Sequence, residues 1–282
     1  MTSFLIRSTR YNPVMDASHR WTLPDQASAL AWARERKGRK IRCTLALLQE
    51  YARTMDEALE AVEGNIICIQ GIAAEWAGPS ISVKLSAIGS IFDPQASLGL
   101  MQRIAREAAR YQVPLELDME GKGSVDLTLD AALACRKEHP NITVALQSYL
   151  GRTGEDLRRM VSQGIGVRLV KGAYLGDYSD FTQIQQMTEQ DCGILKALQA
   201  PFSIGTHDPV LIDWILREFD DRRDLVEFGF LKGLSEQTKI GLAAEGWRVS
   251  EYLPFGPGGD AYVHRRERYL QDLEHSGRAP AP

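Results

Sequence analysis

Short apolar segments alternate with longer segments of mixed polarity along most of this chain. Near-continuous apolar runs bounded by polar residues are typical of strands buried on both faces of a parallel sheet. This pattern predicts eight strands, at Ile41–Ala46, Ile81–Leu85, Leu115–Met119, Ile142–Gln147, Gly166–Val170, Phe202–Thr206, Val226–Leu231 and Trp247–Leu253.

The segments that follow these runs have the composition and spacing of helices. We predict helices at Leu47–Glu63, Ala96–Tyr111, Asp126–Glu138, Glu155–Gln163, Gln185–Gln199, Pro209–Asp220, Ser235–Glu245 and Ala261–Glu274. Eight strand–helix units in series predict an α/β protein with a single-domain (β/α)8 TIM-type barrel. We expect the last helix to form part of the barrel wall, because its charges are mixed around it.

Three segments fall outside this regular alternation. Residues 1–40 form an N-terminal leading segment, residues 41–275 form the catalytic barrel, and residues 276–282 form a flexible, Pro-containing tail. Residues 64–80 are expected to be an irregular insertion between the first helix and the second strand.

Composition and charge narrow the class of protein. A length of 282 residues suits one such barrel, which typically has about 250 residues. The formal net charge of −4 argues against a nucleic-acid partner, because such proteins are usually basic. No window approaches 18 uncharged apolar residues, so we expect no transmembrane segment. The four cysteines are widely spread without zinc-site spacing, which predicts reduced thiols, no metal and a cytoplasmic location.

Polar residues interrupt or end most of the predicted strands. Active sites of such barrels lie at the C-terminal ends of the strands. A charged side chain inside a buried strand costs several kcal/mol unless it is paired or used. A series of such strand ends therefore predicts an active site built from Lys84, Asp118, Glu120, Gln147, Arg168, Lys171, Thr206 and His207.

The C-terminal part of the chain supplies a second set of candidate residues. Tyr262, Arg265 and Arg266 are spaced i, i+3 and i+4, so a helix would place all three on one face, and Tyr252 comes shortly before them. Because the guanidinium group pairs with carboxylate in a planar fork, this face suits a small molecule with a carboxylate and an apolar body.

Several familiar cofactor and catalytic motifs are missing from the sequence. No GxGxxG follows a predicted strand, and there is no P-loop, HExxH or GxSxG. A flavin, if bound, would therefore have to lie at the mouth of the barrel and not in a Rossmann-type site.

Taken in order, the strand-end motifs resemble those of the proline dehydrogenase family, including the barrels of bifunctional proline-utilisation proteins. The resemblance extends from about residue 41 to residue 270, with one motif per strand. The matching segments are Ser82–Ala87, Leu117–Glu120, Leu146–Tyr149, Val167–Tyr174, Thr206–Asp208 and Tyr252–Arg266.

This resemblance implies roles for individual residues. Arg168, Lys84 and Asp118 correspond to the catalytic group, with Asp118 orienting the cluster and Arg168 near flavin N5. The implied substrate-binding residues are Lys84, Leu231, Tyr252, Tyr262, Arg265 and Arg266. The implied cofactor-binding residues are Gln147, Arg168, Lys171, Gly172, Ala173, Thr206 and His207. Glu50 resembles a carboxylate that pairs with an arginine of the last helix.

The resemblance also implies an activity. It predicts flavin-dependent oxidation of L-proline to Δ1-pyrroline-5-carboxylate in proline catabolism, by hydride transfer from C5 to flavin N5. The expected cofactor is FAD, with FMN as the alternative. The expected electron acceptor is a quinone or another carrier, and transient association with the inner membrane stays open.

Departures from the family pattern keep alternatives open. The family often has aspartate and glycine where this chain has Ala46 and Gln49, and Tyr269 stands where a glutamate is common. One alternative is a dehydrogenase for hydroxyproline or another cyclic imino acid. Another is a Schiff-base lyase that uses Lys84 or Lys171 as its nucleophile. A third is a flavin-free barrel that binds an amino acid.

Overall fold

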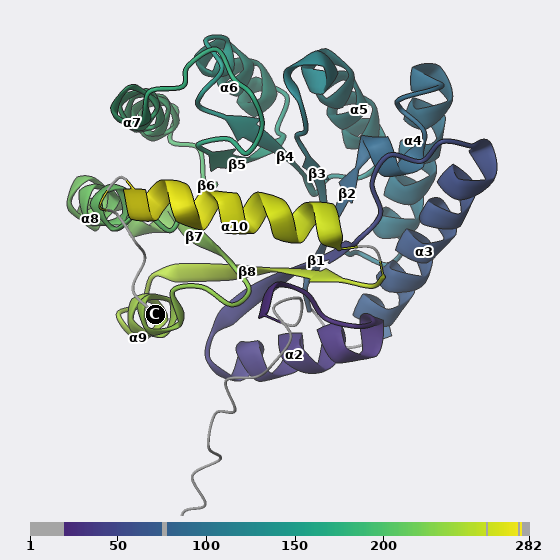
Figure 1. Cartoon of the computed structure of the whole chain (residues 1–282), viewed down its shortest axis with the longest axis horizontal. Helices are drawn as coiled ribbons and strands as arrows, with labels where there is room; N and C mark the ends of the chain where they lie inside the picture. The colour runs from purple at the N-terminus through teal and green to yellow at the C-terminus, as the bar shows by residue number, and fades with distance from the viewer. Residues whose placement is uncertain (1–19, 75–77, 258, 276, 278–282) are drawn as a thin grey trace, which may run out of the picture.

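The strands of the molecule pair in chain order, each parallel to the next, and β8 pairs with β1 to close a barrel (Figure 1). The computed structural model describes residues 20–74, 78–257, 259–275 and 277. The strands are β1 (Ile41–Leu47), β2 (Ser80–Lys84), β3 (Leu115–Asp118), β4 (Ile142–Gln147), β5 (Gly166–Val170), β6 (Phe202–Gly205), β7 (Val226–Leu231) and β8 (Arg248–Phe255). The predicted (β/α)8 fold is therefore confirmed; the predicted tail lies almost wholly outside the described residues.

One helix precedes β1 and a helix follows each strand, and most of these helices cover the outside of the barrel. They are α2 (Gln26–Gly38), α3 (Met55–Ala74), α4 (Pro94–Arg110), α5 (Val125–Glu138), α6 (Thr153–Ser162), α7 (Phe181–Ala197), α8 (Pro209–Glu218), α9 (Glu236–Ala244) and α10 (Asp260–His275). Local sequence fixes several starts. The Asp208 side chain accepts a hydrogen bond from the Val210 amide at 3.0 Å, with Pro209 in the first turn.

The irregular insertion expected at residues 64–80 is wrong. Helix α3 continues to Ala74, and it begins at Met55, eight residues after the predicted start at Leu47. Ile66, Ile69 and Ile72 recur at a spacing of three residues and are buried, so this stretch forms the apolar face of a helix.

The expected leading segment contains a helix that the sequence pattern did not predict. Asp25 caps α2 by accepting from the Ser28 amide at 2.7 Å. Ala29 and Ala33 are buried where α2 packs against β1 and β8. The helix thus covers the seam at which the first and last strands meet.

The expectation that the last helix belongs to the barrel wall is also wrong. Figure 1 shows α10, in yellow, running across the front of the barrel, whereas α3 to α9 lie around it. Arg265 of α10 pairs with Glu50 in the loop after β1, and the ring of Tyr269 lies 5.9 Å from that of His207 after β6. Because both partners follow the C-terminal ends of strands, α10 lies across the mouth of the barrel.

Side chains that point into the barrel form a polar column. Successive residues of a strand face opposite sides, so one face of each strand packs on the helices and the other faces the barrel axis. Arg42 of β1 reaches Glu227 of β7 at 2.7 Å, and Thr44 donates to Glu116 of β3 at 2.8 Å. These contacts between non-adjacent strands cross the interior, and the column ends at the mouth.

Candidate active site

Asp118 lies at the centre of the charged cluster where the polar column reaches the mouth. Its Oδ2 lies 3.1 Å from Lys84 Nζ and accepts from the Tyr252 hydroxyl at 2.5 Å. Its Oδ1 accepts from the Ser82 hydroxyl at 2.7 Å and from the guanidinium of Arg168. Side chains from β2, β5 and β8 thus converge on a single carboxylate of β3.

The electrostatics of this cluster keep its members charged. Burial alone would raise the pKa of Asp118, but the charges of Lys84 and Arg168 outweigh burial and hold that pKa well below its usual range. Burial likewise opposes the charge of Lys84, yet Tyr252, Asp118 and Glu50 raise its pKa well above the usual value. A Schiff-base nucleophile needs an uncharged amine, so this environment disfavours the lyase alternative at Lys84.

Helix α10 adds two arginines above this cluster. Arg265 pairs with Glu50, whose Oε1 also lies 3.9 Å from Lys84 Nζ. Arg266 lies with its guanidinium carbon 4.8 Å from the centre of the Tyr262 ring. Within the described part of the chain, no carboxylate lies within ion-pair distance of the half-buried Arg266. The mouth therefore holds a cation that its own carboxylates do not neutralise.

Tyr262 lies near Lys84 and both arginines of α10. Its side chain is buried beside Leu48 and Leu234, and its hydroxyl has no hydrogen-bond partner among the described residues. Burial raises the pKa of Tyr262, while Arg266, Lys84 and Arg265 act to lower it. One phenol is thus within electrostatic reach of all three candidate carboxylate-binding cations.

Gln147 is the last residue of β4, and Lys171 directly follows β5. The amide nitrogen of Gln147 donates to the backbone carbonyl of Glu120 at 3.2 Å, and its Oε1 is buried without a partner among the described atoms. Lys171 Nζ lies 2.6 Å from Asp208 Oδ2 and 4.0 Å from the centre of the Phe181 ring. The Gln147 oxygen is available to a donor from a bound molecule.

The loop after β5 has a backbone that only glycine accommodates easily. Gly172 has φ +131°, and a Cβ there would lie 1.3 Å from a ring atom of Tyr149. A Cβ at Gly176 would lie 1.6 Å from the same ring. The Tyr149 ring therefore fits between two glycines, and Ala173 follows the first of them.

Thr206 and His207 connect neighbouring strand ends. His207 Nε2 accepts from the Leu231 amide at 2.9 Å, and Thr206 Oγ1 accepts from the Asp208 amide at 3.2 Å. Burial, with the nearby charges of Lys239 and Arg266, lowers the pKa of His207 to about 3. His207 is thus a neutral acceptor that fixes the backbone of Leu231.

Sequence reasoning missed several residues of the cluster. Ser82 binds Asp118, Glu116 lies 3.6 Å below Arg168 Nε, and the Tyr174 ring lies 5.5 Å from the guanidinium of Arg265. The signal was present for Ser82 and Glu116, because each lies two residues before a candidate residue and so faces the same side of its strand.

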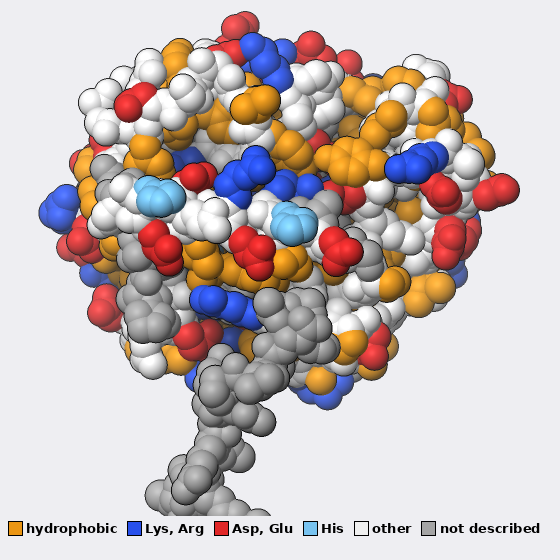
Figure 2. Space-filling view, viewed as in Figure 1, with side chains coloured by type: hydrophobic (Ala, Val, Ile, Leu, Met, Phe, Trp, Pro, Cys, Tyr) orange, Lys and Arg blue, Asp and Glu red, His pale blue; other side chains and the backbone are white. Residues whose placement is uncertain are grey.

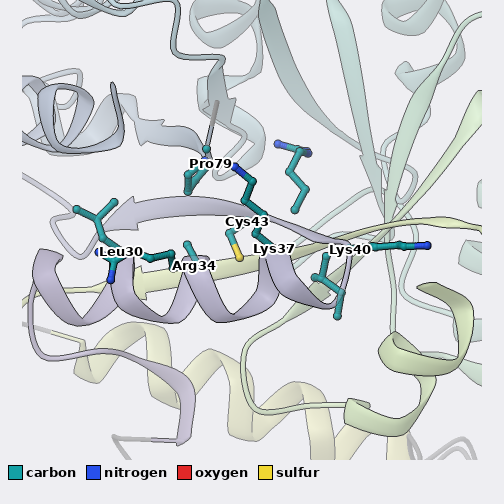
Figure 3. A pocket seen from close by; sticks show the side chains of 10 residues that line it. Leu30, Arg34, Lys37, Lys40, Cys43 and Pro79 are labelled. Atoms are coloured by element: carbon teal, nitrogen blue, oxygen red, sulfur yellow. The ribbon is translucent and has the colours of Figure 1, made fainter. Parts of the chain in front are cut away.

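A separate cavity of about 270 Å³ lies between α2 and the start of β1, far from the mouth (Figure 3). Arg34, Lys37 and Lys40 line it together with apolar residues such as Leu30 and Pro79. The charged strand ends converge at the mouth and not at this cavity, so the mouth is the candidate active site.

Figure 2 shows Lys and Arg side chains gathered along the middle of the face that α10 crosses.

The described residues contain no group of three His, Cys, Asp or Glu side chains arranged to hold a metal ion. None of their helices combines the length and apolar character needed to cross a bilayer.

Comparison with known proteins gives a consistent family. The family model described as proline dehydrogenase matches residues 29–191. Proline dehydrogenase from Deinococcus radiodurans is 33% identical over 248 residues, which cover 83% of this chain and 79% of that protein. Proline dehydrogenase 2 from Bacillus subtilis is 28% identical over 251 residues, which cover 86% of this chain and 82% of that protein.

Solved structures agree in fold. The crystal structure of proline utilization A (PutA) from Bdellovibrio bacteriovorus has a TM-score of 0.79 at 20% identity. The match covers 89% of this chain but 32% of PutA, so this chain spans about a third of that protein. On the family model and the relatives together, this chain belongs to the proline dehydrogenase family of oxidoreductases, which implies a flavin cofactor.

Proposed function

We propose that this protein oxidises L-proline to Δ1-pyrroline-5-carboxylate, in proline catabolism, with FAD as its cofactor. The observation that carries the proposal is Arg266, a half-buried guanidinium beside Tyr262 with no carboxylate partner within the described residues. An un-neutralised cation at a buried site favours an anionic ligand. The family match supports an amino acid carboxylate as that ligand.

The two ends of the pocket suit the two ends of proline. Lys84, Arg265 and Arg266 would bind the carboxylate, because together they provide charged donors from β2 and α10. Tyr252, Tyr262 and Leu231 would cover the apolar ring. The Tyr252 hydroxyl is held by Asp118, which fixes the plane of its phenol.

The cofactor-side residues fit a flavin. The buried, unpartnered Gln147 Oε1 suits an N–H donor of the pyrimidine edge, and Arg168 Nε has no hydrogen-bond partner among the described residues. Lys171, Gly172 and Ala173 would contact the flavin chain and ring, and Thr206 and His207 the phosphate or adenosine part. When bound, the flavin supplies the two-electron acceptor for a hydride from proline C5.

The residues of the chain would bind and orient the substrate, and neither Asp118 nor Tyr252 is suited to act as a general base. Asp118 has a pKa far below neutrality, and burial raises the pKa of Tyr252 well above its usual value. Neither group takes up a proton readily near pH 7. The substrate amine would therefore lose its extra proton to solvent before it reacts. Arg168 would stabilise negative charge that develops beside it.

The electron acceptor and the location are part of the proposal. We propose a cytoplasmic enzyme that passes electrons to a quinone or another carrier, with transient association with the inner membrane. A preference for a substituted ring, such as hydroxyproline, would place a polar group against Tyr252.

The test uses the visible absorption spectrum of the purified protein under anaerobic conditions. A flavin spectrum that bleaches with L-proline is the expected result. Cyclopentanecarboxylate, which has the carboxylate and ring size of proline but no ring nitrogen, should perturb the spectrum without bleaching it. Bleaching with hydroxyproline and not with proline would reassign the substrate. A protein that takes up neither FAD nor FMN would overturn the proposal.

A further inference from the structure

Glu251 is a fully buried carboxylate on the outer face of β8, away from the polar column. Its exposed fraction is 0%, and it accepts hydrogen bonds at both oxygens. Trp32 Nε1 and Arg36 Nε, both of α2, donate to Oε2 at 2.8 Å. Lys239 of α9, also 0% exposed, forms an ion pair with Oε1. One carboxylate thus joins α2, α9 and β8.

The ammonium of Lys239 also contacts the backbone at the end of β7. Its Nζ donates to the backbone carbonyl of Leu231 at 3.3 Å. The amide of the same residue donates to His207 Nε2 at 2.9 Å. Both polar backbone groups of Leu231 are therefore held by side chains, one from α9 and one from the end of β6.

Strand geometry connects this outer contact with the pocket. Neighbouring residues of a strand point to opposite faces. The contacts of Glu251 on the outside therefore fix the position of Tyr252, on the inside, along the barrel axis. The backbone of Lys232 donates to the carbonyl of Tyr252 at 3.1 Å, which ties the ends of β7 and β8 together. A shift of Lys239 relative to Glu251 would move Leu231 relative to Tyr252.

The Lys239–Glu251 pair is charged, although apolar residues could also fill these buried positions. Two buried charges cost desolvation energy, and well-packed apolar residues at such positions are often as stable. A charge-assisted hydrogen bond differs from an apolar contact because it fixes direction as well as distance. Arg36 keeps a separate bidentate pair with Glu236, so its charge does not depend on Glu251 alone.

We infer that Lys239 and Glu251 are a positioning pair for the substrate pocket, which sets Leu231 and Tyr252 at the spacing that a five-membered ring requires. The inference rests on the proposed function for the identity of the ring. It assigns a role in substrate binding to two side chains on the far side of the β-sheet from the pocket.

The test is the double variant Lys239→Met/Glu251→Gln of the holoenzyme, which removes both charges and leaves the Arg36–Glu236 pair intact. Two quantities are measured: the affinity for cyclopentanecarboxylate by calorimetry, and amide hydrogen exchange at Leu231 without ligand. We expect affinity to fall about tenfold and exchange at Leu231 to accelerate by a similar factor. The KM for L-proline should rise with a smaller change in kcat.

The matched control is Arg103→Gln/Glu63→Gln, which removes an exposed ion pair between α4 and α3. It should change neither quantity. If the double variant does not fold, Lys239→Gln alone keeps the Glu251–Arg36 contact and loses the reach to Leu231, so the same two readouts apply.

The outcomes separate this inference from the proposed function. A folded double variant with unchanged exchange at Leu231 and unchanged affinity would overturn the positioning role. If the wild-type protein bound neither cyclopentanecarboxylate nor proline, the proposed function would fail. Exchange at Leu231 would still decide whether the pair holds the end of β7.

Discussion

Asp118 and Glu251 are two buried carboxylates with similar partners on opposite faces of the same barrel wall. Asp118 contacts Lys84 and Arg168 and accepts from the Tyr252 hydroxyl. Glu251 contacts Lys239 and Arg36 and accepts from an indole. The residue at the mouth is 9% exposed, and the outer one is 0% exposed.

What differs is the set of unused polar atoms around each carboxylate. Near Asp118, within the described residues, the Arg168 Nε and Tyr262 hydroxyl atoms have no hydrogen-bond partner, and the Arg266 charge is not neutralised. Both oxygens of Glu251, in contrast, carry donors. A buried ion cluster with surplus donors next to solvent is suited to a ligand, whereas a closed one is suited to holding elements in place.

The largest expected effect on stability comes from disrupting the cluster around Glu251, in which both carboxylate oxygens already have donors. Glu251→Gln should lower the free energy of unfolding by about 3–5 kcal/mol, because it leaves the buried Lys239 short of its main counter-charge. Urea denaturation measures this loss. The double variant Lys239→Met/Glu251→Gln should lose less than the single one, and an equal or larger loss would contradict the pairing argument.

Asp118→Asn should act mainly on catalysis. The amide cannot balance both Lys84 and Arg168, so we expect kcat/KM for L-proline to fall about 100-fold, or about 2.7 kcal/mol. The free energy of unfolding should change by only about 1–2 kcal/mol, because water can reach the mouth. Steady-state kinetics with urea denaturation separates the two effects. A stability loss as large as that of Glu251→Gln would remove the distinction between the clusters.

Arg266→Met tests the surplus cation directly. Loss of a charged hydrogen bond to the substrate carboxylate, worth about 1.5–3 kcal/mol, should raise the KM for L-proline about 10- to 100-fold, with a smaller effect on kcat. Arg268→Met is the control, because Arg268 lies two residues along the same helix and is exposed. Equal kinetics for the two variants would remove Arg266 from the binding site.

His207 responds to both clusters, because Lys239 on one side and Arg266 on the other lower its pKa together with burial. Its folded pKa of about 3 lies below the unfolded value of 6.5, so the unfolded chain binds a proton first as pH falls. Between pH 7 and 5 this should remove about 2 kcal/mol of stability.

His207→Gln should lose that part of the acid sensitivity, since the amide oxygen can still accept from Leu231. Urea midpoints of both proteins at the two pH values give the difference. Asp191, whose pKa burial raises to about 6, contributes an opposite trend, but equally in both proteins. Parallel curves would show that His207 does not titrate as described.

The candidate residues at the mouth could be predicted because they are charged residues within otherwise apolar segments. Lys84, Asp118 and Arg168 are charges within short apolar runs, and the order of a barrel brings such strand ends together. Glu251 is also a charge within a predicted strand, but no second cluster was predicted from it. Its partners Arg36 and Lys239 lie on helices, where a charge is ordinary.

Helix positions were less predictable than strands for a physical reason. The buried face of α2 is made of small residues such as Ala29 and Ala33, which give little contrast with their neighbours. Ile66 and Ile69 show the right spacing, but the helix that contains them is longer than the usual three turns. That α10 crosses the mouth depends on contacts with Glu50 and His207, which no local pattern encodes.

The seam between the first and last strands has a consequence for how the molecule is made. Arg36 and Glu251 are 215 residues apart, and β1 and β8 pair along seven registered positions. During synthesis α2 and β1 leave the ribosome long before their partners exist, so they wait with an unpaired strand edge and a charge without its counter-ion. Contacts of such high sequence separation fold slowly and leave the nascent chain prone to aggregation. Translation that pauses before residue 248 should therefore produce an insoluble chain, because β1 lacks its partner β8 until that strand is made.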